Sequence, residues 1–313
     1  MWPPTVVADK EPFVDVPFYW VDVFAATPLT GNPLALVPDA DALPEHTMGA
    51  IARELNQSET TFLVRPDRPG ADHRLRSFTP GGVEVFGAGH NAMGAWIWLA
   101  LSGRLAPDRD TFVQQIGADL LNVRVSGRPP EAVEVSMEQS APRFLGHVEG
   151  RAALAAVLGL DAEDLDADRA AEVVSTGAEH LLVPLRSAAA VDAAQPDTAA
   201  LRALLADAGA EGCYLYTVQL DDAAAVDPAA GVNAYTRFFN PTVGIAEDPA
   251  TGTAAGPLAA VLVRDGLAPD PARIVVEQGR KLGRPSLITL GVDGPLVTIS
   301  GSGIVVAEGT LHL

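Results

Sequence analysis

The sequence lacks several features that would place it in a familiar class of protein. It has one cysteine, Cys213, among 313 residues, so no disulfide can form within the chain. It has no uninterrupted apolar run of about 18 residues of the kind that crosses a membrane. Its first residues also lack the basic and apolar segments of a secretory signal. We therefore expect an intracellular, cytoplasmic protein without membrane association.

Positive charge is scarce as well. The 21 lysine and arginine residues are outnumbered by 40 aspartate and glutamate residues, and the formal net charge is −19. A nucleic-acid-binding protein needs a basic surface that displaces counterions, so this balance argues against nucleic acid as a partner. Hydrophobic residues make up 48% of the chain and charged residues 19%, which is typical of a well-packed domain or pair of lobes.

Common catalytic motifs are also missing. The six histidines form no cluster with acids at metal-ligand spacing, and the chain has neither a P-loop nor a G-x-S-x-G motif. The segment Gly87-Ala88-Gly89-His90-Asn91-Ala92 does fit the dinucleotide pattern G-x-G-x-x-[G/A]. However, the strand expected at 111–115 ends without the acid that such a site requires about 20 residues on. We therefore expect no metal and no other cofactor.

The densest chemical signal is the segment from Gly244 to Gly256. Pro249 favours an extended residue at Asp248, and the following run AAGPLAAVLV predicts a helix. The free N–H groups at the start of that helix, together with Asp248 and the Thr253 hydroxyl, would suit a small anion such as a carboxylate. The alternative is a plain turn followed by a capped helix.

A second segment repeats this plan about 160 residues earlier. Arg76-Ser77-Phe78-Thr79-Pro80 and Arg237-Phe238-Phe239-Asn240-Pro241 share the pattern R-x-F-[T/N]-P. A loop follows each, then Gly89-His90 or Gly252-Thr253, and then a run of small and apolar residues. Such a duplication predicts two lobes that face each other across a cleft, each contributing the start of one helix.

The remaining pattern consists of many short strands with one apolar helix in each half. It predicts an α+β protein of two pseudo-symmetric lobes, each a mostly antiparallel sheet wrapped around a central helix. The two central helices are expected at 89–101 and 252–264. We expect an N-terminal lobe of residues 16–128 plus 301–313 and a C-terminal lobe of residues 129–300. The apolar segment Ile304-Val305-Val306 is expected to return to the first lobe, and residues 1–15 to form an irregular arm.

Three side chains are candidates for acid–base chemistry. Glu59 lies at the start of a predicted strand, where a carboxylate is otherwise a solvated loop acid. His90 opens the first central helix, where a lone histidine is commonly a capping or packed residue. Asp248 precedes the second central helix, where an acid also stabilises the helix dipole. Glu84 and Glu247 are interpreted as flanking groups that orient the others.

With these residues in view, the chain resembles the phenazine-biosynthesis PhzF-like family, which has the diaminopimelate epimerase-like fold. The stretches that carry the resemblance lie between about residues 18 and 305: Val21-Asp22-Val23-Phe24, Gly31-Asn32-Pro33, Asn56-Gln57-Ser58-Glu59-Thr60-Thr61-Phe62, Phe78-Thr79-Pro80, Glu84, Gly89-His90, Ser175-Thr176-Gly177, Glu247-Asp248-Pro249-Ala250-Thr251-Gly252-Thr253-Ala254, Gln278-Gly279 and Gly283-Arg284-Pro285. The blocks E-D-P-A-T-G-[S/T]-A and S-E-T-x-F are the most specific of these.

The resemblance implies roles for individual residues. The family's catalytic carboxylate falls on Glu59, and His90 and Asp248 complete the catalytic group. The expected substrate-binding residues are Gly89, Asn91, Thr251, Gly252 and Thr253. Epimerases of this fold use two cysteines, but this chain has no sulfur near Ala88 or at Pro249 to Thr251, which excludes a two-cysteine racemase.

The chain departs from the family pattern near the first central helix. The stretch from Thr79-Pro80 to Glu84 is one residue longer than expected, Gly87-Ala88 replaces an apolar residue, and Asn91 follows His90 where proline or alanine is common. These changes reshape the predicted pocket wall, so they bear on the substrate more than on the chemistry.

The resemblance implies a cofactor-independent isomerase that moves a proton on a small carboxylate-bearing, unsaturated or cyclic metabolite, with Glu59 as general acid and base. Two alternatives stay open. One is a hydrolase of C–C or C–N bonds that uses the same residues, and the other is a binding protein without chemistry. A homodimer is expected, and the lobes are expected to close over the ligand and exclude water.

Overall fold

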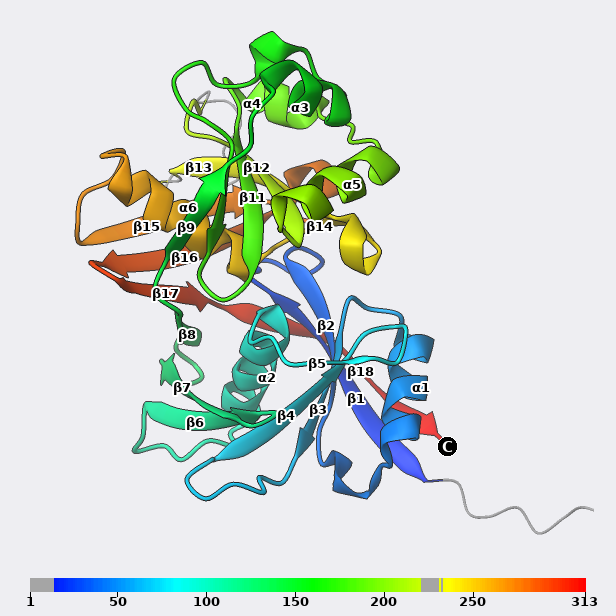
Figure 1. Cartoon of the computed structure of the whole chain (residues 1–313). Coiled ribbons are helices and arrows are strands. Elements are labelled where there is room, and N and C mark those ends of the chain that lie inside the picture. The colour runs from blue at the N-terminus through cyan, green and yellow to red at the C-terminus, as the bar shows by residue number, and fades with distance from the viewer. Residues whose placement is uncertain (1–13, 221–230, 232) are drawn as a thin grey trace, which may run out of the picture.

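The structure, a computed structural model, describes residues 14–220, 231 and 233–313 (Figure 1). The elements that we call the first half are β1 (Asp15–Val23), β2 (Asn32–Val37), α1 (Glu45–Leu55), β3 (Thr60–Val64), β4 (His73–Phe78), β5 (Glu84–Val85), α2 (His90–Leu101), β6 (Thr111–Ile116), β7 (Asp119–Ser126) and β8 (Glu134–Gln139). The second half comprises β9 (Arg143–His147), α3 (Arg151–Val157), β10 (Glu172–Ser175), β11 (Glu179–Pro184), α4 (Ala188–Ala193), α5 (Thr198–Ala208), β12 (Gly212–Thr217), β13 (Ala234–Asn240), β14 (Ile245–Asp248), α6 (Gly252–Arg264), β15 (Ala272–Gln278), β16 (Ser286–Asp293) and β17 (Leu296–Gly301). The last strand is β18 (Gly303–His312).

Strand pairing follows one plan in both halves. In the first half β1 pairs antiparallel with β2, β2 parallel with β3, β3 antiparallel with β4, and β4 antiparallel with β5 and parallel with β6. In the second half the same relations join β10 to β11, β11 to β12, β12 to β13, and β13 to β14 and β15. An antiparallel run then closes each half, through β6, β7 and β8 or through β15, β16 and β17.

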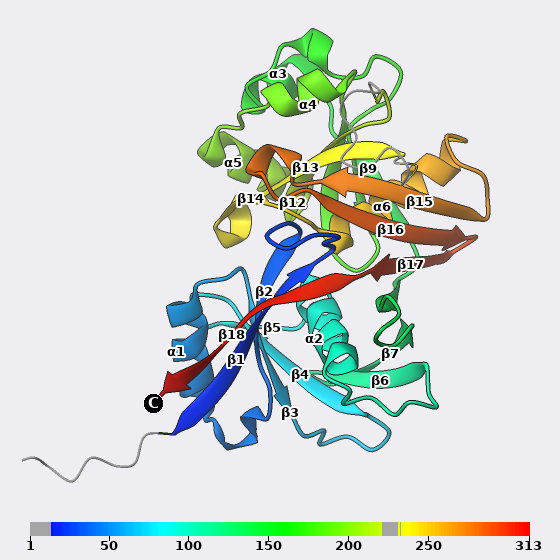
Figure 2. The same cartoon turned by 180° about the vertical axis from the view of Figure 1, so that it is seen from behind.

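The two halves are joined by strands. β8 pairs with β17, and β18 returns to pair with β1 along nearly its whole length. Figure 2 shows this return, with the red β18 lying beside the blue β1. The expected return of the Ile304 segment to the first half is therefore confirmed. The exact lobe boundaries at 128/129 and 300/301 stay a prediction.

Each half encloses one apolar helix. All residues of α2 from His90 to Ala100 are buried, and α6 is buried from Gly252 to Leu262 apart from Thr253. A helix that is apolar on every side has no face to present to water, so both must lie inside their sheets. Trp96 and Ile97 of α2 belong to the same apolar cluster as the buried core of α6. Each large side chain buried in this way stabilises the fold by about 1.5–3 kcal/mol.

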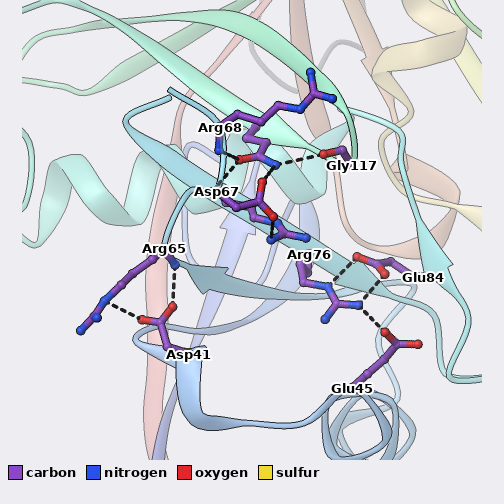
Figure 3. Close-up of polar contacts among 10 residues, drawn as sticks. Asp41, Glu45, Arg65, Asp67, Arg68, Arg76, Glu84 and Gly117 are labelled. Carbon is purple, nitrogen blue, oxygen red and sulfur yellow. Dashed lines mark hydrogen bonds and ion pairs between the residues drawn. The ribbon is translucent and has the colours of Figure 1, made fainter. Parts of the chain in front are cut away.

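The repeated R-x-F-[T/N]-P pattern marks equivalent places in the two halves. Arg76 of β4 forms an ion pair with Glu84 of β5, and Figure 3 shows its guanidinium between Glu84 and Glu45. Arg237 of β13 likewise forms an ion pair with Glu247 of β14. Each pair ties a short strand to its neighbour.

Strand register extends this equivalence. Phe62 of β3 lies opposite Arg76, and Leu215 of β12 lies opposite Arg237. Because the two arginines are equivalent, Phe62 and Leu215 are equivalent as well, and residues can be matched along β3 and β12 by counting from them.

Most of the predicted elements are present within a few residues of their expected ends. Of the strands and α-helices given above, β5, β9, α4 and β14 were not predicted. The sequence pattern predicts a strand at 212–220, but β12 ends at Thr217. It ends there because the residues from Val218 to Leu220 have no strand partner among the described residues. The expected arm at 1–15 lies outside the described residues except for its last two, and the expected start of β13 at Val232 also lies outside them.

Candidate active site

Glu59 lies directly before β3, on the side of the strand that faces α2. Side chains alternate along a strand, and Thr61 faces α2, since its hydroxyl lies 3.4 Å from the Asn91 carbonyl oxygen. Glu59 shares that face, and its Oε2 atom lies 3.3 Å from His90 Nε2. Ser58 Oγ also lies 3.3 Å from His90 Nε2. The predicted acid and histidine are therefore neighbours.

The contact between Glu59 and His90 does not have hydrogen-bond geometry. Oε2 of Glu59 is buried and has no hydrogen-bond partner among the described residues. The Glu59 side chain is 21% exposed and that of His90 is 10% exposed. A carboxylate that is enclosed but incompletely bonded can take up a proton at low cost, as a general base must.

Asp248 is held by residues from both halves. Asn32 of β2 donates from Nδ2 to Asp248 Oδ1 at 2.9 Å and to the Ala250 carbonyl at 2.9 Å. The Thr251 hydroxyl donates to Asp248 Oδ2. Gln278 donates to the Asp248 carbonyl oxygen at 2.7 Å and to the Thr251 hydroxyl at 3.1 Å. The carboxylate is thus fixed at both oxygens, in a site where only 8% of the residue is exposed.

Burial shifts the pKa values of all three groups. It raises the pKa of Glu59, an effect that the Ser58 hydroxyl opposes. Burial also raises the pKa of Asp248, to about 6, although the adjacent His90 acts to lower it and the charge on Glu59 adds to the rise. The pKa of His90 is lowered by burial, against the effect of Asp248. The two acids therefore hold protons more readily, and the imidazole less readily, than the same groups do in water.

The raised pKa of Asp248 predicts how stability depends on pH. The folded state binds this proton more tightly than the unfolded chain, with a pKa of about 6 against 3.8. The stabilisation is therefore complete below the lower value and is lost as the pH rises through the higher one, a change of roughly 3 kcal/mol. We expect the melting temperature of Asp248→Asn, relative to wild type, to rise between about pH 4 and about pH 7.

Thermal unfolding of the two proteins across this range, with Asp207→Asn as a control at an exposed acid on α5, measures the effect. A difference in melting temperature that stays constant with pH contradicts the assignment.

The two central helices begin without side-chain caps. Neither N-cap residue, Gly89 of α2 or Thr251 of α6, accepts from the first turn with its own side chain, although the N–H groups of these two residues donate to Asn91 and Gln278. Their first N–H groups, and the positive end of each helix dipole, are therefore available to an anion. The expectation that Gly89 and Gly252 bind the substrate stays a prediction.

The other predicted binding residues have partners within the protein. Asn91 accepts from the Gly89 N–H at 2.8 Å and donates to Ser77 Oγ and the Gly87 carbonyl, both at 3.0 Å. It therefore fixes the shape of the backbone before α2. Thr251 is engaged with Asp248, as described above. The direct contact of either side chain with a substrate stays a prediction.

Glu59 has no acidic counterpart at the equivalent position of the second half. Phe62 and Leu215 are equivalent, and Glu59 and Gly212 each lie the same number of residues before them. Gly212 is therefore the second-half counterpart of Glu59. A Cβ atom at Gly212 would lie only 2.3 Å from the Phe238 ring. A side chain of any kind is therefore excluded at that position unless the ring moves. A carboxylate therefore stands at this strand position in the first half and not in the second.

Four residues of this arrangement were not among the predicted site residues: Asn32, Ser58, His180 and Gln278. Asn32, Ser58 and Gln278 lie within the sequence stretches that carry the family resemblance, which was the available signal. His180 has no such signal, and its Nε2 atom lies 3.2 Å from Thr253 Oγ1.

A separate pocket of about 260 Å³ lies beside the ion pair of Arg237 and Glu247. It is also lined by Pro196, Leu201 and Phe239. Arg237 and Phe239 point away from α6, because the intervening Phe238 packs in the core around that helix. This pocket is therefore on the opposite face of the sheet from Asp248.

Comparisons with known proteins place nearly the whole chain in one family. A family model described as phenazine biosynthesis-like protein matches residues 21–309, which is nearly the whole chain. The chain belongs to the phenazine biosynthesis-like protein family. A relative, trans-2,3-dihydro-3-hydroxyanthranilate isomerase of Pseudomonas aeruginosa, is 35% identical over 298 residues, covering 94% of this chain and 98% of that protein.

Two solved structures share the fold of this family member. A PhzF-family phenazine biosynthesis protein of Bacillus anthracis has a TM-score of 0.86 at 25% identity, covering 96% of this chain and 100% of that chain. A predicted epimerase of Pseudomonas aeruginosa has a TM-score of 0.79 at 33% identity, with 95% and 99% covered. The predicted family and α+β fold class are confirmed, and the chain is an isomerase of the phenazine biosynthesis-like family.

Two further observations concern the described part of this family member. None of its helices is both long enough and apolar enough to span a bilayer. Within the same residues, no three histidine, cysteine or acidic side chains are grouped as metal ligands. The cofactor-free reaction and the cytoplasmic location stay predictions.

Proposed function

We propose that this isomerase moves a proton between two carbons of a small, carboxylate-bearing, unsaturated or cyclic metabolite, with Glu59 as the single general acid and base. The observation that carries the proposal is the enclosed pair of Glu59 and His90, with Asp248 fixed nearby and Gly212 in place of a second acid. If Glu59 is the only group that exchanges a proton with the substrate, it returns the proton that it removes from its own side of the substrate.

The proposed reaction has two steps. Ionised Glu59 accepts a proton from a saturated carbon, and the electron pair of the broken C–H bond enters the adjacent double-bond system. Protonated Glu59 then gives the proton to a carbon at the other end of that system, so atoms and charge balance. The raised pKa of Glu59 suits both steps, because the same group acts first as base and then as acid.

His90 and Asp248 are proposed to hold the polar groups of the substrate. His90 is neutral because burial lowers its pKa, so it can donate one hydrogen bond without carrying a charge. Asp248 can accept from an amino or hydroxyl group, since its position is fixed by Asn32 and Thr251. The substrate carboxylate would meet the uncapped starts of α2 and α6 together with the Thr253 hydroxyl.

The relative from Pseudomonas aeruginosa supplies a chemical probe through its printed name. Trans-2,3-dihydro-3-hydroxyanthranilate carries a carboxylate, an amino group, a hydroxyl group and a conjugated ring with two saturated carbons. These groups match the donors and acceptors proposed for this site. We expect this chain to act on a cyclic, unsaturated amino acid of the same chemical class.

The test is turnover in D2O followed by NMR, with this probe and a small panel of cyclic unsaturated amino acids. A proton shift predicts loss of a ring C–H signal and a new C–H position that carries deuterium in part or in full. A new C–H position that carries only hydrogen from the substrate is also a proton shift, because an enclosed Glu59 need not exchange with solvent.

Two results contradict the proposal. Uptake of solvent oxygen or cleavage of a C–C or C–N bond, detected by mass spectrometry in H2¹⁸O, would show a hydrolase. Saturable binding without any chemical change across the panel would show a binding protein.

Assembly and motion belong to the same proposal. The lobes of residues 16–128 plus 301–313 and of residues 129–300 are proposed to close over the ligand, and two copies to form a homodimer. The hydrogen bond from Asn32 of β2 to Asp248 joins the two halves beside the site. It supports a closure in which the halves stay in contact at this point while they move relative to each other.

A further inference from the structure

His180 of β11 is a buried histidine for which the proposed reaction gives no role. It is 2% exposed, and its ring packs edge-on against Phe238, with centroids 5.1 Å apart and planes at 87°. Its Nε2 atom lies 3.2 Å from Thr253 Oγ1. Its other nitrogen, Nδ1, is buried and has no hydrogen-bond partner among the described residues.

The equivalent place in the first half is apolar. In the second half, His180 lies opposite Gly212, the counterpart of Glu59. In the first half Ala35 lies opposite Thr60, so the preceding Leu34 lies beside Glu59 and is the counterpart of His180. Leu34 is fully buried in the core around α2. The fold therefore accepts an aliphatic side chain there, and an imidazole with an unbonded nitrogen costs more to bury than leucine does. A structural role alone does not require histidine.

The contacts of His180 identify which ring nitrogen carries the proton. Burial lowers the pKa of His180 to about 4, so the ring is neutral at pH 7 and has one N–H. If the proton were on Nδ1, a buried N–H donor would have no acceptor. With the proton on Nε2, the ring donates to Thr253 Oγ1 and leaves only an acceptor lone pair unbonded, which is the less costly arrangement.

This tautomer determines the direction of the Thr253 hydroxyl. The oxygen of Thr253 accepts the hydrogen bond from His180, so its own hydrogen is directed elsewhere. Thr253 lies in the first turn of α6, where the side chain of the N-cap residue Thr251 accepts from no backbone N–H. A hydroxyl hydrogen and backbone N–H groups then all act as donors at one place.

We propose that His180 is a positioning residue that holds Thr253 as a hydrogen-bond donor toward the carboxylate of the substrate. This inference rests on the proposed function for the identity of the ligand, but not for the state of the His180 ring. His180 itself touches no substrate. Its effect is to favour an anion over a neutral acceptor–donor group such as a carboxamide at the start of α6.

The first test concerns the ring and needs no substrate. Two-dimensional NMR of the imidazole nitrogens at pH 7, assigned by the loss of signals in His180→Gln, identifies the protonated nitrogen. We expect the proton on Nε2 of a neutral ring. A proton on Nδ1, or a doubly protonated ring, overturns the proposal whether or not the protein turns over the probe.

The second test uses kinetics with trans-2,3-dihydro-3-hydroxyanthranilate. His180→Leu copies the first half and should raise KM about tenfold, with kcat changed less than about threefold, because one charge-assisted hydrogen bond loses its direction. His180→Gln keeps an N–H donor and should restore most of the affinity. His147→Leu, at an exposed histidine on β9, is the matched control and should leave KM unchanged.

A double-mutant cycle separates positioning from simple packing. In a Thr253→Ala background, His180→Leu should have no further effect on KM, since the hydroxyl that it directs is gone. Equal effects of His180→Leu with and without Thr253 would assign His180 to packing and overturn the proposal. If wild-type protein neither binds nor converts the probe, the proposed function has failed for this substrate class, and the nitrogen spectrum alone decides the role of His180.

Discussion

Glu59→Gln is expected to lower kcat by at least about a thousandfold and to change KM for the probe less than about threefold. Glutamine has the shape of the carboxylate but cannot carry a proton, so binding survives and proton transfer does not. Burial already raises the pKa of Glu59, and the neutral amide avoids the cost of a buried charge. The variant should therefore melt no lower than wild type at neutral pH.

The matched control is Glu54→Gln, at an exposed acid on α1 five residues earlier in the chain. It should retain wild-type kcat. Steady-state kinetics on both variants, with melting temperatures, decides the matter. A Glu59→Gln protein with activity within threefold of wild type would remove Glu59 from the mechanism.

Asp248→Asn is expected to lower kcat/KM by about a hundredfold. The wild-type carboxylate accepts from Asn32 at one oxygen and from Thr251 at the other. An amide can accept at only one of these positions, so its NH2 group opposes either the Asn32 donor or the present direction of the Thr251 hydroxyl. The negative charge beside His90 is lost as well.

The same change is expected to act on stability in the opposite direction at neutral pH, because it removes a buried carboxylate whose pKa is about 6. Lower activity combined with higher stability distinguishes a functional acid from a structural one. Asp207→Asn on α5 should alter neither property. If Asp248→Asn were to lose stability and activity together, the aspartate would be a structural residue of the second half.

The two central helices and the duplication of this fold can be predicted from the sequence, because both depend on local residue patterns. Two runs that are apolar on every side, at 90–101 and 252–264, have no stable position except inside a sheet. The repeated R-x-F-[T/N]-P pattern places Arg76 and Arg237 at equivalent positions, and both form ion pairs with acids of the next strand. Duplication is therefore visible in the residues before any strand is paired.

The short elements and the long-range contacts could not be predicted in this way. β5 has two residues and β14 has four, which is too few for an alternating pattern to stand out. Asn32 reaches Asp248 across 216 positions of sequence, and nothing near either residue indicates the other. His180 lies in an apolar strand, where its polarity alone does not reveal that it contacts Thr253.

The geometry of the proposed catalytic group could be predicted only in part. Glu59 and His90 become neighbours because β3 and the start of α2 meet on one face of the sheet, which a sequence pattern cannot establish. Glu84 and Glu247, interpreted from the sequence as flanking groups, are each bound to an arginine. Those two acids are thereby occupied, which supports the proposal that Glu59 is the acid that exchanges a proton.

The most direct measurement of the central claim is a crystal structure of the Glu59→Gln variant with unreacted trans-2,3-dihydro-3-hydroxyanthranilate. We predict that a saturated ring carbon lies about 3–3.5 Å from the side-chain amide at position 59, and that the carboxylate lies at Thr253 and the start of α6. A ligand seated in the pocket beside Arg237 and Glu247, or with its saturated carbons turned away from position 59, would contradict the account.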